Sequence, residues 1–147
     1  MLEEKIQQDI KAAMLAKDTV ALASVRAIKA AILLAKTAEG SKPVDDAEIV
    51  KIIQKLVKQR KESAEIYSQQ NRPELAENEL AEAAVMEKYL PKQLSEAEIE
   101  AKVKEIIAHV GATSMADMGK VMGTATKALA GAADGKVISA LVRKLLA

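Results

Sequence analysis

One short stretch near the middle of the chain, residues 89–98, limits how the rest can fold. Pro91 has no amide hydrogen and disfavours helical geometry in Leu90, so a helix that runs into it must end there. Shortly afterwards Ser95 can cap a new helix, and Glu98 stands where it can complete a capping box. A forced end and a strong start this close together predict a hinge. We therefore expect an N-terminal helical domain over residues 1–92 and a C-terminal domain over residues 93–147.

Apolar residues recur at helical spacing on both sides of this hinge, and no stretch alternates as a strand does. We expect four helices before it, over about residues 2–17, 19–39, 46–69 and 73–90, with a turn at Glu39-Gly40 and a loop at 41–43. Three shorter helices are expected after it, each preceded by a capping residue: Ser95, Ser114 and Asp134. The prediction is an all-α fold, with an N-terminal four-helix body joined by a proline hinge to a C-terminal three-helix unit.

Composition removes several classes of function. The chain has no cysteine and one histidine, so thiolate zinc sites and cysteine nucleophiles are excluded, and we expect no metal and no cofactor. No apolar run approaches the ~18 residues that a membrane span needs. The charged N-terminal sequence does not resemble a signal peptide, so we expect a cytoplasmic protein without a membrane partner.

Three charged residues fall on apolar helix faces. At about 100° per residue, Arg60 lies in the apolar stripe of the third helix, and Glu79 and Glu82 lie on the apolar side of the fourth. Because a lone buried charge is costly, we predict that Arg60 pairs with Glu79, Glu82 or both. The carboxylates could serve acid–base chemistry, but a structural ion pair is favoured, since no nucleophile or metal-ligand cluster lies near them in sequence. Replacing Arg60 with Leu is then expected to cost ~3–5 kcal/mol.

The same helix carries a row of lysines on its opposite side, at positions 51, 55, 58 and 61. Such a row can contact phosphates, but it is more often a solvated helix face.

The C-terminal domain has a different charge balance. Residues 1–90 carry 14 basic and 15 acidic side chains, whereas residues 91–147 carry 8 and 6. From residue 106 onward only Asp117 and Asp134 offset five basic residues: Lys120, Lys127, Lys136, Arg143 and Lys144. A basic surface without aromatic rings suits the backbone of a folded RNA, and it is equally compatible with an ordinary helical surface.

Two glycines on the expected sixth helix need an explanation. Gly119 and Gly123 are four residues apart, and each costs about 1 kcal/mol relative to alanine within a helix. Their expected compensation is the close approach of another backbone, from either a packed helix or a ligand. His109 precedes a helix stop at Gly111, where a capping or surface role is favoured over that of a lone base.

Several segments, taken in order along the chain, resemble the YqeY family. They are Lys58–Ser63, Arg72–Ala76, Tyr89–Leu94, Asp117–Met122 and Ala133–Lys136. The YqeY family is similar to the C-terminal tail of the GatB subunit of the tRNA-dependent amidotransferase, which converts Glu-tRNA(Gln) or Asp-tRNA(Asn) to the amide form. The resemblance implies four N-terminal and three C-terminal helices, and it implies RNA contacts at Gly119, Lys120, Gly123 and Lys136.

Three functions follow as expectations. The first is a non-catalytic module that binds tRNA, or a protein of tRNA metabolism, through its C-terminal domain. The second is a protein-interaction adaptor with an adaptable surface around Met115, Met118 and Met122. The third, an amidotransferase-related carbon–nitrogen ligase that uses glutamine as nitrogen donor, is implied by the resemblance alone, because the chain has no nucleophile constellation and no nucleotide-binding loop. Whether the protein is an enzyme stays open, with catalysis the less favoured answer.

Overall fold

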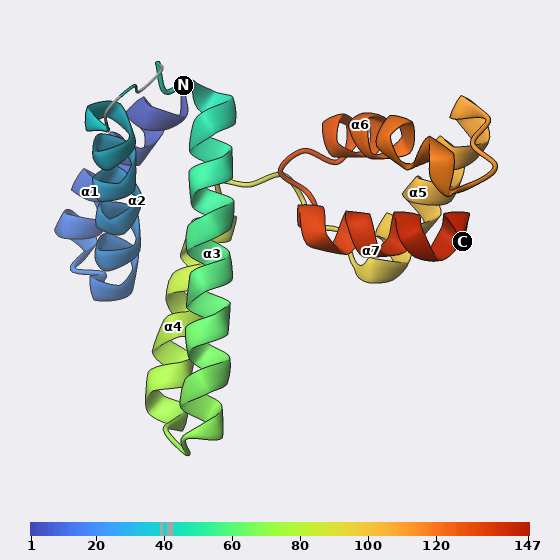
Figure 1. Cartoon of the computed structure of the whole chain (residues 1–147). Coiled ribbons are helices and arrows are strands. Elements are labelled where there is room, and N and C mark those ends of the chain that lie inside the picture. Colours follow the sequence, from blue (N-terminus) through green and yellow to red (C-terminus); the bar gives the residue numbers. More distant parts are fainter. Residues whose placement is uncertain (39, 41–42) are drawn as a thin grey trace. The chain divides into compact units, whose positions relative to one another are not determined.

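The computed structural model describes residues 1–38, 40 and 43–147, and across them it shows seven α-helices, one 3-10 helix and no strand (Figure 1). The elements are α1 (Leu2–Ala16), α2 (Thr19–Thr37), α3 (Asp46–Gln69), α4 (Pro73–Glu87), α5 (Glu96–Val110), η1 (Met115–Asp117), α6 (Met118–Ala128) and α7 (Gly135–Leu146). The all-α prediction is confirmed for these residues. The expected turn at Glu39 and most of the expected loop at 41–43 concern residues 39, 41 and 42, which lie outside the described residues.

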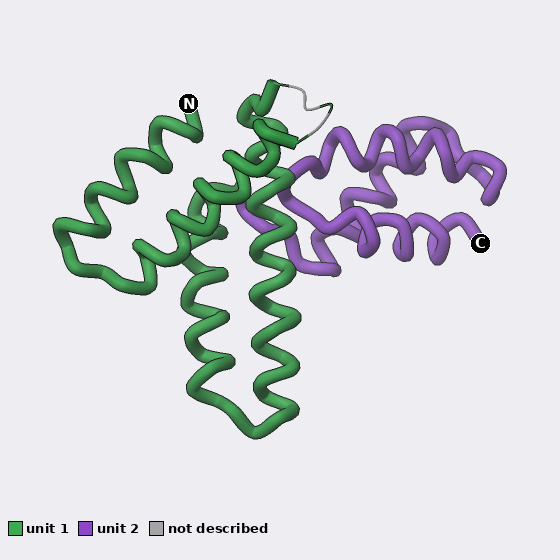
Figure 2. Tube along the Cα trace, turned by 60° about the vertical axis from the view of Figure 1, so that its left-hand side comes forward, with its two compact units in different colours: residues 1–90 green, residues 91–147 purple. Residues whose placement is uncertain are grey.

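The chain divides into two compact units, which are taken here one at a time (Figure 2). Unit 1 is Met1–Leu90 and contains α1 to α4, and unit 2 is Pro91–Ala147 and contains α5 to α7.

Unit 1 consists of two helical hairpins, α1 with α2 and the longer α3 with α4 (Figure 1). Asp18 starts α2 by accepting a hydrogen bond from the Ala21 amide at 3.0 Å, and Asp45 starts α3 by accepting one from the Glu48 amide at 2.9 Å. One apolar side of each helix then enters a common core: Ile6, Val25, Ile28, Ile32, Ile49, Ile53, Val57, Ala83 and Met86.

The closed end of the α3/α4 hairpin extends beyond the part that α1 and α2 cover (Figure 1). Past Val57 on α3 and before Ala83 on α4, the buried side chains are Ala64 and Ala76. We call this part, residues 58–82, the hairpin arm. These small side chains let α3 and α4 approach closely. The arm is therefore held together by the contact between its own two helices.

Unit 2 is a three-helix unit with its own core. The hydroxyl of Ser95 accepts a hydrogen bond from the Glu98 amide at 3.2 Å, and the Glu98 carboxylate accepts one from the Ser95 amide at 3.3 Å, which completes the capping box predicted for α5. Gly111 ends α5 in the left-handed region at φ 70°. Apolar residues of all three helices meet inside: Ile99, Val103, Val121, Ala125, Leu129, Ala133, Ile138, Leu141, Val142 and Leu146.

One predicted helix end is wrong, and one predicted helix begins with a 3-10 turn. The fourth helix was expected to reach Leu90, but α4 ends at Glu87. The amides of residues 88–90 instead bond to carbonyls three residues back, as in Leu90 N to Glu87 O at 3.0 Å, so the chain tightens before Pro91. The sixth helix was expected to begin directly after Ser114. Instead, the Ser114 hydroxyl accepts a hydrogen bond from the Ala116 amide and opens η1, and α6 follows from Met118. The Asp117 carboxylate accepts a hydrogen bond from the Thr113 amide at 3.0 Å.

Candidate functional site

The basic side chains predicted to contact RNA are all exposed on two helices of unit 2. Lys120 and Lys127 are seven residues apart on α6, so they project from the same side of the helix. On α7, Lys136 lies in the first turn and Arg143 seven residues later, again on one side. The structure therefore arranges these four cations as one pair along each helix.

Few carboxylates lie close to these basic side chains. Within the described part of the chain, no carboxylate lies within 4.0 Å of Lys120, Lys127, Lys136 or Arg143, whereas Lys144 Nζ is 3.9 Å from Glu100 Oε1. The Asp117 carboxylate accepts from the Thr113 amide, and the Asp134 carboxylate accepts from the Lys136 amide at 2.9 Å to start α7. Both acids of this region thus serve helix starts.

The two glycines of α6 lie open to solvent beside Lys120. A Cβ placed on Gly119 or Gly123 would meet no atom of the described chain within 4 Å. Close packing of another helix of unit 2 therefore does not explain them. At 100° per residue they share the outward side of α6 with the exposed Thr126, so a surface of short side chains runs beside the Lys120–Lys127 line.

Arg60 on α3 faces Glu79 and Glu82 on α4, the two acids with which it was predicted to pair. Its Nε is 3.7 Å from Glu79 Oε2 and 4.0 Å from Glu82 Oε1, and Glu82 also accepts a hydrogen bond from Asn78. The Arg60 side chain is 24% exposed and the Glu79 side chain 21%. Partial exposure lowers the expected cost of losing the arginine from ~3–5 to about 1–2 kcal/mol, because water reaches the stranded acids.

One ion pair between α3 and α4 was not predicted from the sequence. Lys61 was predicted to face outward in a row of lysines, but its Nζ lies 2.6 Å from Glu87 Oε1, an oxygen that is itself buried. A second member of that row, Lys51, is 3.4 Å from Glu48 in the same helix. The row is therefore not a set of uncompensated charges. The only sequence signal for the Lys61 pair was its position at the edge of the α3 contact stripe.

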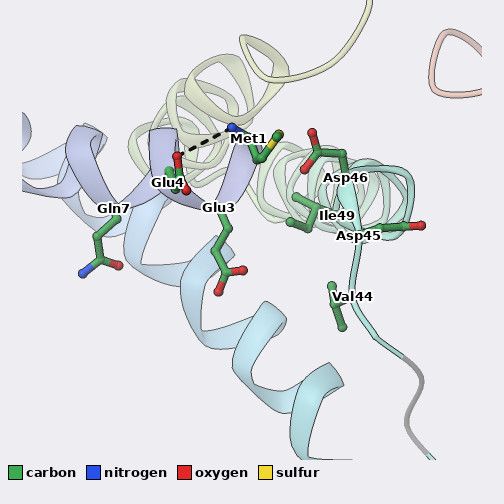
Figure 3. A pocket seen from close by; sticks show the side chains of 8 residues that line it. All are labelled: Met1, Glu3, Glu4, Gln7, Val44, Asp45, Asp46 and Ile49. Atoms are coloured by element: carbon green, nitrogen blue, oxygen red, sulfur yellow. Dashed lines mark ion pairs between the residues drawn. The ribbon is translucent and has the colours of Figure 1, made fainter.

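A cavity of about 660 Å³ lies in unit 1 where α1 and α3 begin, and several acids line it beside Met1, Val44 and Ile49 (Figure 3). The Glu4 carboxylate is 3.9 Å from the Met1 amine. The other acids are engaged too: Asp45 caps α3, Asp46 accepts a hydrogen bond from the Leu2 amide at 3.2 Å, and Glu3 pairs with Lys36. These acids therefore take part in contacts at helix ends.

Tyr89 is the other polar group of note in unit 1. Its hydroxyl donates a hydrogen bond to Asp9, and Lys5 Nζ lies 5.4 Å from the centre of its ring. Burial, followed by the bond to Asp9, raises the pKa of the Tyr89 hydroxyl far above its usual range. The hydroxyl therefore stays protonated and acts as a fixed donor that ties the end of α4 to α1.

The described residues offer no group of three or more His, Cys, Asp or Glu side chains that could hold a metal ion. His109 is exposed in the last turn of α5, where a cation suits the helix dipole. Across the described helices, none is long and apolar enough to cross a membrane.

Comparison with known proteins gives the chain a family. A family model described as "Yqey-like protein" matches residues 3–146. Curated relatives named "Altered inheritance of mitochondria protein 41, mitochondrial" include one from Meyerozyma guilliermondii, 36% identical over 107 residues, which are 71% of this chain and 56% of that protein. Another, from Pyrenophora tritici-repentis, is 32% identical over 148 residues, covering 97% of this chain and 79% of the relative.

A third relative of the same name, from Lachancea thermotolerans, is 33% identical over 69% of this chain and 56% of its own length. The chain thus spans about half the length of the first and third of these relatives. The family model, by contrast, runs from α1 to the last turn of α7. This chain belongs to the YqeY family.

Proposed function

We propose that unit 2 is a non-catalytic module that binds folded RNA, in the first place tRNA, through the outward sides of α6 and α7. It acts either on the RNA directly or within a complex similar to the tRNA-dependent amidotransferase. The observation that carries the proposal is the set of four exposed cations, Lys120, Lys127, Lys136 and Arg143, without a carboxylate within 4.0 Å in the described chain. Phosphates are the ligands that such unpaired cations suit best.

The neighbouring surface of α6 supports the same ligand. Gly119 and Gly123 remove the side chains that would keep a sugar–phosphate backbone away from the helix. Both tyrosines of the chain, Tyr67 and Tyr89, lie in unit 1, and the chain has no Phe or Trp, so unit 2 lacks the row of aromatic side chains on which successive bases stack. Recognition would then depend on the shape and phosphate positions of a folded RNA rather than on single-stranded bases.

The proposal includes two domains, residues 1–92 and 93–147, that move about a hinge at Pro91. Supporting it, Tyr89 is bonded to Asp9 in unit 1, and Gln93 Nε2 donates to Gly131 O at 2.7 Å in unit 2. Leu94 N also donates to Ala132 O at 3.0 Å. The chain is therefore fixed on both sides, and the segment between Tyr89 and Gln93 is where a rotation would occur.

The test is binding of the full chain to deacylated tRNA, measured by fluorescence anisotropy across a salt series. Each phosphate neutralised contributes about −0.7 to −0.9 to the slope of log K against log salt, so four contacts predict a slope of roughly −3. Alanine at positions 120, 127, 136 and 143 should abolish that slope and lower affinity about a thousandfold at ~0.1 M salt.

The matched control removes four exposed lysines of unit 1, at positions 11, 17, 29 and 55, and changes the net charge equally. If the control weakens binding as much as the unit 2 variant, the interface is wrongly placed. If wild-type protein shows no saturable binding at low salt, the RNA proposal fails.

A protein-interaction adaptor is the second candidate, and one observation favours it. Leu15, Leu33 and Leu34 are exposed on unit 1, with Leu15 at 87% and Leu34 at 71%. The methionine surface expected for an adaptor is smaller than predicted, because Met118 and Met122 pack on the core of unit 2 and Met115 is the exposed one. The test is co-purification of a protein partner from a lysate with wild type and with a variant that has alanine at Leu33 and Leu34. A partner that still co-purifies with the variant would count against this surface.

Two further parts of the sequence interpretation stay predictions. An amidotransferase-related ligase activity has only the family resemblance behind it and would need glutamine-dependent amide formation by the chain alone. A cytoplasmic location is predicted from the N-terminal sequence, while the relatives named above carry "mitochondrial" in their names. Fractionation of cells that express the tagged chain decides the second point.

A further inference from the structure

Unit 1 contains a second cavity that none of the functions above uses. It has a volume of about 360 Å³ and lies where the end of α4 meets α1 and the start of α2. Lys5, Asp9, Ala12 and Ala16 lie three or four residues apart, so they line it from one side of α1 over roughly 16 Å. The volume falls in the range of small-molecule sites.

The two ends of this cavity differ in chemistry. Toward the turn between α1 and α2 the walls are mostly small and apolar, formed by alanines at 12, 13, 16 and 21 with Val25 and Val85, and the one charged group there is Asp18 at the start of α2. Toward the end of α4 the lining carries charges of both signs, from Lys5, Asp9 and Lys88, together with the Tyr89 hydroxyl. A ligand that fills both ends must therefore have an apolar tail and a charged head.

The charged groups are arranged so that they do not neutralise one another. Within the described chain, neither Lys5 nor Lys88 has a carboxylate within 4.0 Å. Asp9 accepts the Tyr89 hydrogen bond through Oδ2, which fixes its orientation and leaves Oδ1 available as an acceptor. The fourth charged lining residue, Asp18, accepts the α2 capping bond through one oxygen.

We propose that this cavity binds a small zwitterion with an aliphatic tail, an α-amino acid of about the size of leucine. Its tail occupies the alanine-lined end, its carboxylate meets Lys5 and Lys88, and its ammonium group meets Asp9. At the end near α4 the lining has two cations and one anion, so a carboxylate gains from the lysines and an added ammonium group gains from Asp9. A zwitterion gains from both.

The test is an NMR titration of the ¹⁵N-labelled full chain with L-leucine, 4-methylpentanoate and 3-methylbutylamine, which share one tail and differ in their charges. We expect saturable shifts of the Ala12, Ala16 and Val85 amides with leucine, at a roughly millimolar dissociation constant. The analogues that lack one charge should bind about tenfold more weakly. Equal binding of all three ligands, or no shift with leucine, overturns the proposal.

Two variants locate the site, each with a matched control. Ala16→Leu fills the apolar end at an exposed position, so the fold should tolerate it, and it should abolish the leucine shifts; Ala23→Leu on the outer side of α2 should not. Lys88→Gln should lower the affinity for leucine about tenfold, whereas Lys11→Gln on the far side of α1 should leave that affinity unchanged. Wild-type affinity in Ala16→Leu would place any leucine binding elsewhere.

Discussion

Three basic residues of the α3/α4 hairpin, Arg60, Lys61 and Arg72, lie within 4.0 Å of carboxylates, whereas Lys120 and Lys127 on α6 have none that close in the described chain. The sequence suggested a row of available cations in both places. The difference lies in geometry, because Glu79, Glu82 and Glu87 of α4 lie within 4.0 Å of Arg60 or Lys61 on α3, whereas the acids of α5 lie farther from the two α6 lysines. A count of charges therefore predicts an interface only when the partners of each charge are known.

The largest expected effect tests whether the two units are separate bodies at all. Met86→Ala empties a fully buried site of unit 1 and should destabilise that unit by about 2–5 kcal/mol. Ile138→Ala should do the same to unit 2. Amide hydrogen exchange resolves the two, and each substitution should leave protection in the other unit unchanged. If one substitution lowers protection throughout the chain, the units are a single cooperative body.

The next largest effect compares the stability lost when an ion-paired side chain is removed with the stability lost when a side chain without an ion pair is removed. Arg60→Leu strands Glu79 and Glu82 and should cost about 1–2 kcal/mol, whereas Lys127→Ala should lie within ~0.5 kcal/mol of wild type. Urea denaturation monitored by circular dichroism measures both. Equal losses of stability would contradict the difference between the two units. Unchanged RNA affinity in Arg60→Leu would support it further, because Arg60 is then structural only.

A smaller and opposite effect is expected at Gly123. Its Cβ would enter open space, so Gly123→Ala should stabilise unit 2 by about 1 kcal/mol while it lowers RNA affinity. Thermal unfolding and anisotropy measure the two quantities on one preparation. Gly111→Ala is the control that should destabilise instead, because Gly111 has φ 70°. A Gly123 variant with unchanged affinity would mean that RNA does not approach this side of α6.

The smallest effect concerns pH. Hydrogen bonds from the Ser95 backbone amide and then its side chain hold the pKa of Glu98 below its ordinary value of 4.5. A lowered folded-state pKa means that this contribution is present above about pH 4.5 and is lost as pH falls through the folded value. Glu98→Gln should therefore reduce the loss of unit 2 melting temperature as pH falls below about 4.5, and Glu96→Gln in the same turn is the control for the removal of one carboxylate. Parallel curves for wild type and Glu98→Gln would contradict the capping box.

Helix starts could be predicted from sequence because their causes are local. Ser95 and Asp134 were expected as capping residues, and they accept hydrogen bonds from amides three and two residues ahead. The end of α4 was harder, since Pro91 excludes helical geometry at Leu90 but does not say how far back the chain tightens.

The candidate site was predictable only in part. Periodicity placed Arg60 facing Glu79 and Glu82, because Arg60 lies near the middle of the α3 apolar stripe and both acids lie on the apolar side of α4. It failed for Lys61, whose long side chain reaches Glu87 from the edge of its stripe. The openness around Gly119 and Gly123 depends on where α5 and α7 pack, which is a property of the whole unit and not of the α6 sequence.

The hairpin arm has an evolutionary consequence. Its interior consists of Ala64 and Ala76 and the contact between two helices, and it contributes no buried side chain to the shared core. Inserting or deleting one turn in α3 together with one turn in α4 would thus change the arm's length by about 5 Å and leave the core intact. Natural selection can therefore vary the reach of this arm in small steps, independently of the stability of the domain that carries it.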